Sequence, residues 1–193
     1  RNVQLDDCTW GMLADKTAPF SYGTTVEGLK GIQQTYKDIN NRLIANAPEG
    51  VTVATHVCRG NFHSTYASSG AYDAVAEVLF GEENAAGYYL EFDDERSGGF
   101  APLAKVSGKK KIVLGLVTTK SSVLESKKAI IERIHEAEKY VPLDRLYLSP
   151  QCGFASCEIG NKLTEEQQWA KLKLVKEIAE EAWERKGKSS LLV

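Results

Sequence analysis

The sequence predicts an α/β fold in which parallel β-strands alternate with α-helices. Short apolar runs of strand length recur along the chain, stretches with helical apolar spacing separate them, and turn-forming residues close most of these stretches. This alternating order implies parallel strands joined by right-handed crossovers. The 193 residues suffice for one core of good size, and we expect residues 1–193 to form a single domain.

Five strands are expected in the sheet. The second is the clearest, because a β-branched and mostly apolar run is typical of a strand that is buried on both faces. The predicted strands cover residues 2–6, 51–57, 87–92, 111–117 and 145–149. Doubly wound sheets and (β/α)₈ barrels both have this order of elements, although five strands are too few to close a barrel.

Four helices are expected between and after these strands. The first is predicted over residues 26–45, after a loop through Ser21-Tyr22-Gly23 and before the turn Pro48-Glu49-Gly50. The last follows Thr164, with Gln167 placed where a capping box needs its acceptor, and runs to about Lys186. The two helices between them are predicted over residues 72–80 and 124–140.

The composition argues against several classes of partner. Hydrophobic residues make up 42% of the chain, charged residues make up 26%, and the formal net charge is −2. This balance gives no general attraction to nucleic acid or to an anionic membrane. No apolar stretch reaches the roughly 20 residues that a membrane-spanning helix needs. We therefore expect a cytoplasmic protein with small-molecule partners, no nucleic acid and no membrane.

The chain begins at Arg1, without an initiator Met, directly before a predicted strand. We therefore expect it to be part of a longer fold. The cysteines are few, widely spread and set among charged residues, which favours free thiols or metal ligands over a disulfide framework. They are Cys8, Cys58, Cys152 and Cys157.

Four metal-binding residue types come from three separate segments at strand ends. His56 and Cys58 lie two residues apart at the end of the second strand, so their side chains share one face. Glu91 ends the third strand, and Cys152 follows the fifth. The carboxyl ends of parallel strands form one edge, which is where such folds place their chemistry. For the His-x-Cys pair alone, a buried cysteine beside a hydrogen-bonded histidine explains the pattern equally well.

This donor set indicates zinc. Two thiolates and an imidazole suit this metal, and a carboxylate completes a tetrahedron. A weakly held carboxylate can give up its place to a substrate thiol, which loses its proton at the metal and becomes a nucleophile. Cys8 and Cys157 are weaker alternatives as ligands, and His63 is a weaker candidate for the wall of the site.

Acidic and basic residues near these ligands are candidates for substrate binding. Asp6 and Asp7 end the first strand at the same edge, where a carboxylate can hold a substrate ammonium group or cap a helix. Arg96 closely follows Glu91 and can bind a carboxylate or position that ligand.

Together these motifs resemble the C-terminal catalytic half of cobalamin-independent methionine synthase, and most closely its short bacterial relatives. The resemblance rests on Leu5-Asp6-Asp7, His56-Val57-Cys58, Leu90-Glu91 and Ser149-Pro150-Gln151-Cys152-Gly153, in this order over nearly the whole chain. It implies a (β/α)₈ barrel of which the chain holds roughly the last five βα units. It also implies methyl transfer from a methyl-folate polyglutamate to the sulfur of homocysteine, giving methionine.

Site residues carry over from this family by position. His56, Cys58, Glu91 and Cys152 would bind Zn²⁺, and Asp6 would bind homocysteine. The family's histidine proton donor does not carry over, because Lys120 stands at its position. A lysine can still act as an acid, so Lys120 is the candidate catalytic residue.

The sequence therefore predicts a zinc-dependent methyltransferase of methionine synthesis, with homocysteine and a folate as substrates. Asp6-Asp7-Cys8 replaces the family's Asp-Glu-Pro, which with Lys120 leaves the methyl donor open. One alternative keeps the zinc and alkylates another thiol or uses a non-folate donor, as in epoxide and coenzyme M chemistry. Another is a zinc-binding piece without activity.

Overall fold

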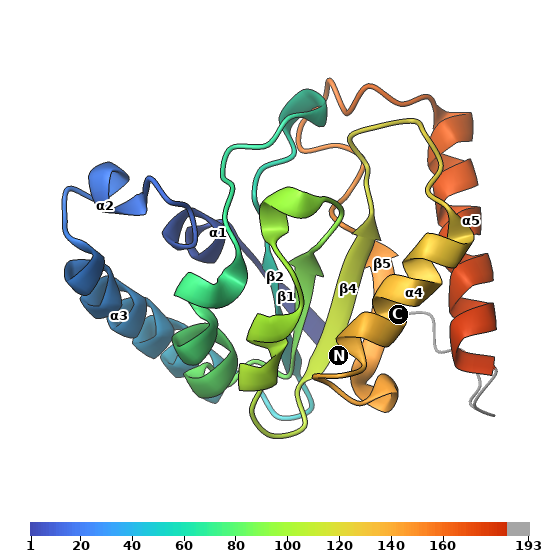
Figure 1. Cartoon of the computed structure of the whole chain (residues 1–193). Helices are drawn as coiled ribbons and strands as arrows, with labels where there is room; N and C mark the ends of the chain where they lie inside the picture. The colour runs from blue at the N-terminus through green and yellow to red at the C-terminus, as the bar shows by residue number, and fades with distance from the viewer. Residues whose placement is uncertain (185–193) are drawn as a thin grey trace.

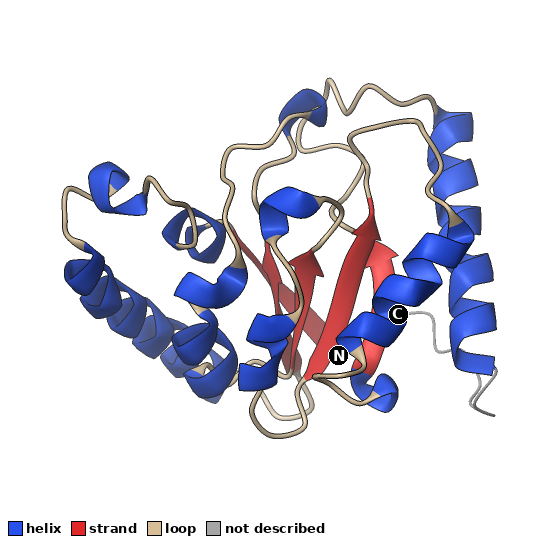
Figure 2. Ribbon diagram, viewed as in Figure 1, coloured by secondary structure: helices blue, strands red, loops and turns tan. Residues whose placement is uncertain are grey.

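A single sheet of five parallel strands organises the computed structural model, which describes residues 1–184. The strands lie in chain order, so each is hydrogen-bonded to its sequence neighbours (Figures 1 and 2). They are β1 (Asn2–Asp7), β2 (Thr52–Val57), β3 (Gly87–Glu91), β4 (Lys111–Val117) and β5 (Leu146–Pro150). This arrangement confirms the α/β prediction and the five parallel βα units of a (β/α)₈ barrel.

Helices flank the sheet (Figure 1), and together with the loops they contribute apolar side chains to its core. The longer helices match the strongest helical patterns, and each has an identifiable N-terminal signal. They are α1 (Thr9–Leu13), α2 (Ala18–Ser21), α3 (Val26–Ala45), α4 (Lys127–Ala137) and α5 (Glu165–Glu184). Short helical turns lie in the loops at Phe62–Ser64, Tyr72–Ala74, Glu77–Glu82, Glu95–Ser97, Ala101–Lys105 and Leu143–Arg145.

Alternate residues of the strands face opposite sides, as strand geometry requires. On one side, Val57, Leu90 and Leu114 are buried in the core with the helices. The other side is hollowed into a cavity of about 150 Å³ that residues of all five strands line. Its lining includes Asn2, Ala54, Tyr89, Val113 and Tyr147. His56 and Glu91 continue this second side toward the carboxyl ends of their strands.

Most predicted elements have the expected bounds. Helix α3 is capped by Thr25, whose Oγ1 accepts a hydrogen bond of 3.1 Å from the Gly28 amide. The capping box before α5 is also present, because Gln167 Oε1 accepts from the Thr164 amide at 2.9 Å and Thr164 Oγ1 accepts from the Gln167 amide at 3.3 Å. The predicted end near Lys186 lies outside the described residues.

Two helix predictions were wrong in detail. The expected helix over residues 72–80 is a short turn at Tyr72–Ala74 followed by a π-helical segment at Glu77–Glu82. Tyr72 and Phe80 are both fully buried, so packing on the sheet overrides regular helix geometry here. The expected helix over residues 124–140 is shorter, because Ser126 caps it and α4 begins only at Lys127.

No helix within residues 1–184 is long and apolar enough to cross a membrane.

Candidate metal centre

The four candidate ligands converge at the carboxyl edge of the sheet. One ligand atom from each of His56, Cys58, Glu91 and Cys152 lies within 4.8 Å of the others. His56 lies at the end of β2 with Cys58 just beyond it, Glu91 ends β3, and Cys152 lies in the loop after β5. Parallel pairing brings these strand ends side by side, with Cα partners His56–Tyr89 and Glu91–Gly115. A nitrogen, two sulfurs and a carboxylate at this spacing match the donor set of a tetrahedral zinc site.

The His56 ring is oriented by a backbone contact. Its Nδ1 lies 3.2 Å from the carbonyl oxygen of Tyr89, and because a carbonyl only accepts, Nδ1 carries the proton. Nε2 is buried and has no hydrogen-bond partner among the described residues. A metal-bound histidine typically has this arrangement, with one ring nitrogen held by a carbonyl and the other left as a ligand.

A hydrogen bond joins the two thiols. A hydrogen bond from Cys152 holds the pKa of Cys58 well below its usual range and raises that of Cys152. The Gly60 amide also donates to Sγ of Cys58 at 3.3 Å, which further favours the Cys58 thiolate. Burial lowers the pKa of His56, but the nearby Cys58 and Glu91 outweigh burial, so the net shift is upward. The cluster therefore holds negative charge beside a basic ring, as a cation site requires.

Glu91 is fully buried and is held by three groups outside the ligand cluster. The Arg59 amide donates to Oε1 at 2.8 Å, and the Arg96 guanidinium donates to Oε2 at 3.1 Å. Nζ of Lys120 lies 3.8 Å from Oε2. Burial raises the pKa of Glu91 to about 7, although Lys120 and the Arg59 amide oppose the shift. The carboxylate is thus fixed in place without help from a metal.

The first strand delivers its two aspartates to different places. Asp6 is the Cα partner of His56 across the β1–β2 pair, and it is exposed on the same side of the sheet. Asp7 points to the buried side, where Oδ1 accepts from the Thr9 amide at 2.9 Å. Asp7 therefore has the loop and helix-start role that the sequence left open, whereas Asp6 faces the candidate site.

The weaker candidates lie outside the cluster. Among residues 1–184, the group of close ligand atoms includes neither Cys8 nor Cys157. Cys8 still neighbours Cys58. Burial and this contact raise the pKa of the Cys8 thiol to about 11. His63 contacts the carbonyl oxygen of Gly160 at 3.2 Å.

Several residues near the site were missed by the sequence analysis. Arg59 directly follows Cys58, is 1% exposed, and stacks over the Tyr72 ring with its guanidinium 4.4 Å from the ring centroid. A group of buried polar side chains also flanks Cys152. Its members are Asn61, Thr119, Gln151 and Asn161. Each lies in a loop that follows a strand, and Gln151 also belongs to the motif that contains Cys152.

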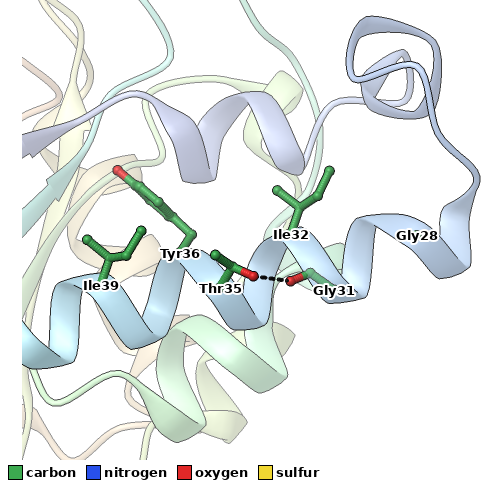
Figure 3. Close-up of a pocket in the computed structure, with 6 residues that line it drawn as sticks. All are labelled: Gly28, Gly31, Ile32, Thr35, Tyr36 and Ile39. Carbon is green, nitrogen blue, oxygen red and sulfur yellow. Dashed lines mark hydrogen bonds between the residues drawn. The ribbon is translucent and has the colours of Figure 1, made fainter.

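A second hollow lies away from these residues, along α3 (Figure 3). Glycines and apolar side chains form most of its lining, and Thr35 donates a hydrogen bond of 3.0 Å to the Gly31 carbonyl within the helix. The lining residues are Gly28, Gly31, Ile32, Thr35, Tyr36 and Ile39. None of the candidate metal ligands lines this hollow, because they all lie at the carboxyl edge of the sheet.

Comparisons with known proteins agree with this geometry. Residues 40–181 match the family described as cobalamin-independent synthase, catalytic domain. The uncharacterized protein YxjG of Bacillus subtilis (strain 168) is 51% identical over 187 residues, covering 95% of this chain and 49% of YxjG. The uncharacterized protein YxjH of that strain is 48% identical over 189 residues, with coverage of 95% and 49%. The chain therefore spans about half the length of the curated relatives that it matches.

Solved structures give the same result. A candidate vitamin-B12 independent methionine synthase from Listeria monocytogenes is 41% identical with a TM-score of 0.70, covering 93% of this chain and 48% of that one. A B12-independent methionine synthase from Shewanella sp. W3-18-1, solved in complex with selenomethionine, is 18% identical with a TM-score of 0.68, covering 95% and 49%. The second likeness supports the fold alone. Since the family match covers residues 40–181, the chain belongs to the cobalamin-independent synthase catalytic-domain family.

Proposed function

We propose that this chain carries the zinc and thiol site of a methyltransferase that moves a methyl group from a 5-methyltetrahydrofolate polyglutamate to homocysteine. One observation carries the proposal, namely that His56, Cys58, Glu91 and Cys152 present their ligand atoms within 4.8 Å of one another. The buried Nε2 of His56, which has no hydrogen-bond partner among the described residues, is suited to be a metal ligand. When bound, zinc would lower the pKa of a thiol so that its thiolate is present at neutral pH.

If zinc is bound, Glu91 would be the ligand best suited to give way to a substrate thiol. The Arg59 amide and the Arg96 guanidinium already hold its two oxygens, and Lys120 lies nearby. The carboxylate therefore keeps charge-assisted partners when it is not a ligand. Cys58 and Cys152 would suit the permanent positions, because thiolates are typical ligands of closed zinc sites.

Asp6 is placed to bind the amino group of the substrate. It is exposed beside His56, on the side of the sheet that carries the ligands. An ammonium group paired with this carboxylate would orient an amino-acid thiol toward the cluster, and fixed orientation is a large part of catalysis for a two-substrate reaction.

Lys120 is the proposed proton donor. Its side chain is 10% exposed, and its ammonium lies close to Glu91 and Asp93 at the edge of the cluster. When the methyl group forms its new bond to sulfur, the bond from the methyl carbon to the donor nitrogen breaks and that nitrogen gains the electron pair. A lysine proton can neutralise this leaving group.

A second candidate keeps the thiol chemistry and changes the methyl or alkyl donor. It is favoured by Lys120, which stands where the family pattern has a histidine. The reaction would then use another thiol or a non-folate electrophile such as an epoxide. The chain covers only about half the length of these relatives. The activity of the whole protein is therefore part of these proposals.

The test measures metal content and methyl transfer on the same purified protein. We expect about one equivalent of zinc, loss of methionine formation after chelation, and recovery when zinc is returned. The assay pairs homocysteine with 5-methyltetrahydrofolate carrying one or three glutamates, and separately with S-methylmethionine or an epoxide. Turnover only with a non-folate donor would exclude the folate proposal, and a protein that binds zinc without any turnover would indicate an inactive zinc-binding chain.

A further inference from the structure

We propose that four buried, uncharged side chains act as a positioning network for Cys152. The members are Asn61, Thr119, Gln151 and Asn161, which come from the loops after β2, β4 and β5. The inference rests on the proposed metal site, because it explains how that site keeps its fourth ligand in place. Cys152 lies two residues beyond the end of β5, further from its strand than the other three ligands, so its position needs support that a strand does not supply.

The network holds both neighbours of Cys152. The Gly153 carbonyl accepts a hydrogen bond of 2.7 Å from Asn61 Nδ2 and another of 2.9 Å from Thr119 Oγ1. On the other flank, the Gln151 side chain accepts from the Thr119 amide and donates to Thr119 Oγ1 at 3.0 Å. The peptide that carries the thiol is therefore tied on both sides to the loops after β2 and β4.

Asn161 closes the network from further along the same loop. Its Nδ2 donates to Asn61 Oδ1 at 2.9 Å and to the Thr119 carbonyl at 2.8 Å. Its Oδ1 accepts from the Ser64 amide at 2.9 Å. Each amide group in the network thus has partners, which offsets the cost of burying it and specifies one arrangement of the loops.

The backbone beneath Cys152 is shaped for this contact. The pairing of β4 with β5 is irregular between Gly115 and Val117, where the chain turns into the Cys152 loop. A Cβ atom on Gly115 would lie 2.7 Å from the Cα atom of Gln151, so a glycine is required for this close approach. Gln151 also donates its amide to the Val117 carbonyl at 2.9 Å. Strand β4 therefore packs closely against Gln151, the residue before Cys152, and hydrogen-bonds to its backbone.

The network also connects the thiol to the proposed proton donor. Thr119 directly precedes Lys120, and Asn61 lies three residues after Cys58. One set of hydrogen bonds therefore sets the relative positions of the three loops that carry Cys58, Lys120 and Cys152. Partners outside the ligand set typically change metal affinity or activity by about 10- to 100-fold when they are removed.

The experiment compares Thr119→Val with Thr119→Ser. Valine keeps the shape of threonine but removes the hydroxyl that contacts Gly153 and Gln151, whereas serine keeps that hydroxyl. We expect Thr119→Val to lose about 10- to 100-fold in zinc affinity, measured by competition with a chromophoric chelator. Thr119→Ser should restore most of the affinity. In the cobalt-substituted protein, the sulfur-to-cobalt absorption of Thr119→Val should fall toward that of Cys152→Ser.

Gln33→Met is the matched control. Gln33 is also a buried amide, with Nε2 donating to the Ala74 carbonyl at 3.1 Å, but it lies on α3 outside the network. The Gln33→Met variant should lower the unfolding free energy without changing zinc affinity or the cobalt spectrum. If Thr119→Val does not fold, Asn161→Ser undergoes the same measurements, with the same expected losses.

Unchanged zinc affinity and an unchanged cobalt spectrum in a folded network variant would overturn the inference while leaving the metal site intact. An unaltered protein that binds neither zinc nor cobalt would overturn the metal site and the network together. The two failures are therefore distinguishable, because the first appears only in the variants and the second in the unaltered chain.

Discussion

Nζ of Lys120 lies 3.8 Å from Oε2 of Glu91, and it lies 3.9 Å from Oδ2 of Asp93. Its side chain is 10% exposed, and Nζ has no hydrogen-bond partner among residues 1–184. A buried ammonium near two carboxylates is held by charge rather than by directed hydrogen bonds, so it is free to turn toward a bound substrate. The loop after β4 thus brings a cation to the place where the proposed reaction needs a proton.

Lys120→Met should lower kcat by about 10²- to 10⁴-fold, the usual contribution of a positioned acid. The KM for homocysteine should change little, because Asp6 and the metal are the proposed contacts for that substrate. Steady-state kinetics with varied homocysteine would measure both constants.

Lys120→Arg separates proton transfer from charge. Arginine keeps the positive charge near Glu91 but does not give up its proton in proteins. We expect kcat to stay low in this variant if Lys120 is the acid. Recovery of kcat to near the unaltered value would mean that only the charge matters, and the proton-donor role would then be wrong.

Asp6→Asn tests the proposed contact with the substrate amino group. The variant keeps the size of the side chain and loses the charge that would pair with an ammonium, so the KM for homocysteine should rise about 10-fold or more. A thiol of similar size without an amino group should be used equally well by both proteins. Asp73→Asn, on the short turn after β2, is the control. Equal loss for both thiols would show that Asp6 has another role.

Much of the fold follows from patterns that a single sequence carries. The run over Lys111–Val117 was predicted with its observed bounds, because continuous apolar residues suit a strand covered on both faces. Helix α3 was also predicted with its observed bounds, since its apolar residues have helical spacing and Pro48 follows its end. Helices α1 and α2 were missed, because they are too short to show a helical period.

The convergence of the candidate metal ligands was predictable for a different reason. His56, Cys58 and Glu91 lie at strand ends, so correct strands place them at one edge. The positioning network was not predictable. Asn61 and Asn161 are 100 positions apart in the sequence, and polar residues in loops are usually exposed. Only the packed structure shows that they meet and are buried.

Arg96→Met should weaken zinc binding through Glu91. The Arg96 guanidinium contacts Glu91 at 3.1 Å and Asp93 at 2.8 Å, so the variant removes an orienting partner and leaves two buried carboxylates facing each other. We expect zinc affinity to fall by about 10- to 100-fold, measured by chelator competition. Arg42→Met, on the exposed part of α3, should leave zinc affinity unchanged.

A double-mutant cycle with Glu91→Gln decides whether Arg96 acts through that ligand. If it does, the loss in the double variant should be smaller than the two single losses added as free energies. Additive losses would show that Arg96 affects zinc binding by another route.

Glu83 makes the stability of the fold depend on pH. It is fully buried, and its carboxylate accepts hydrogen bonds from Trp10 at 3.2 Å and from Asn40 at 2.8 Å. Burial raises its pKa above the ordinary value of 4.5, and the nearby Asp7 adds to the shift. A raised pKa in the folded state means that this group stabilises the fold fully below about pH 4.5. That contribution is lost as the pH rises through the folded-state pKa.

Glu83→Gln should remove this dependence, because an amide has no charge at any pH and its oxygen can still accept from Trp10 and Asn40. Urea unfolding from pH 5 to pH 8 would measure it. The unfolding free energy of the unaltered protein should fall more steeply with rising pH than that of the variant, and at neutral pH the variant should be at least as stable. Glu82→Gln changes the exposed neighbouring carboxylate and should keep the slope of the unaltered protein. Parallel slopes for the unaltered protein and Glu83→Gln would mean that Glu83 does not change its protonation on folding.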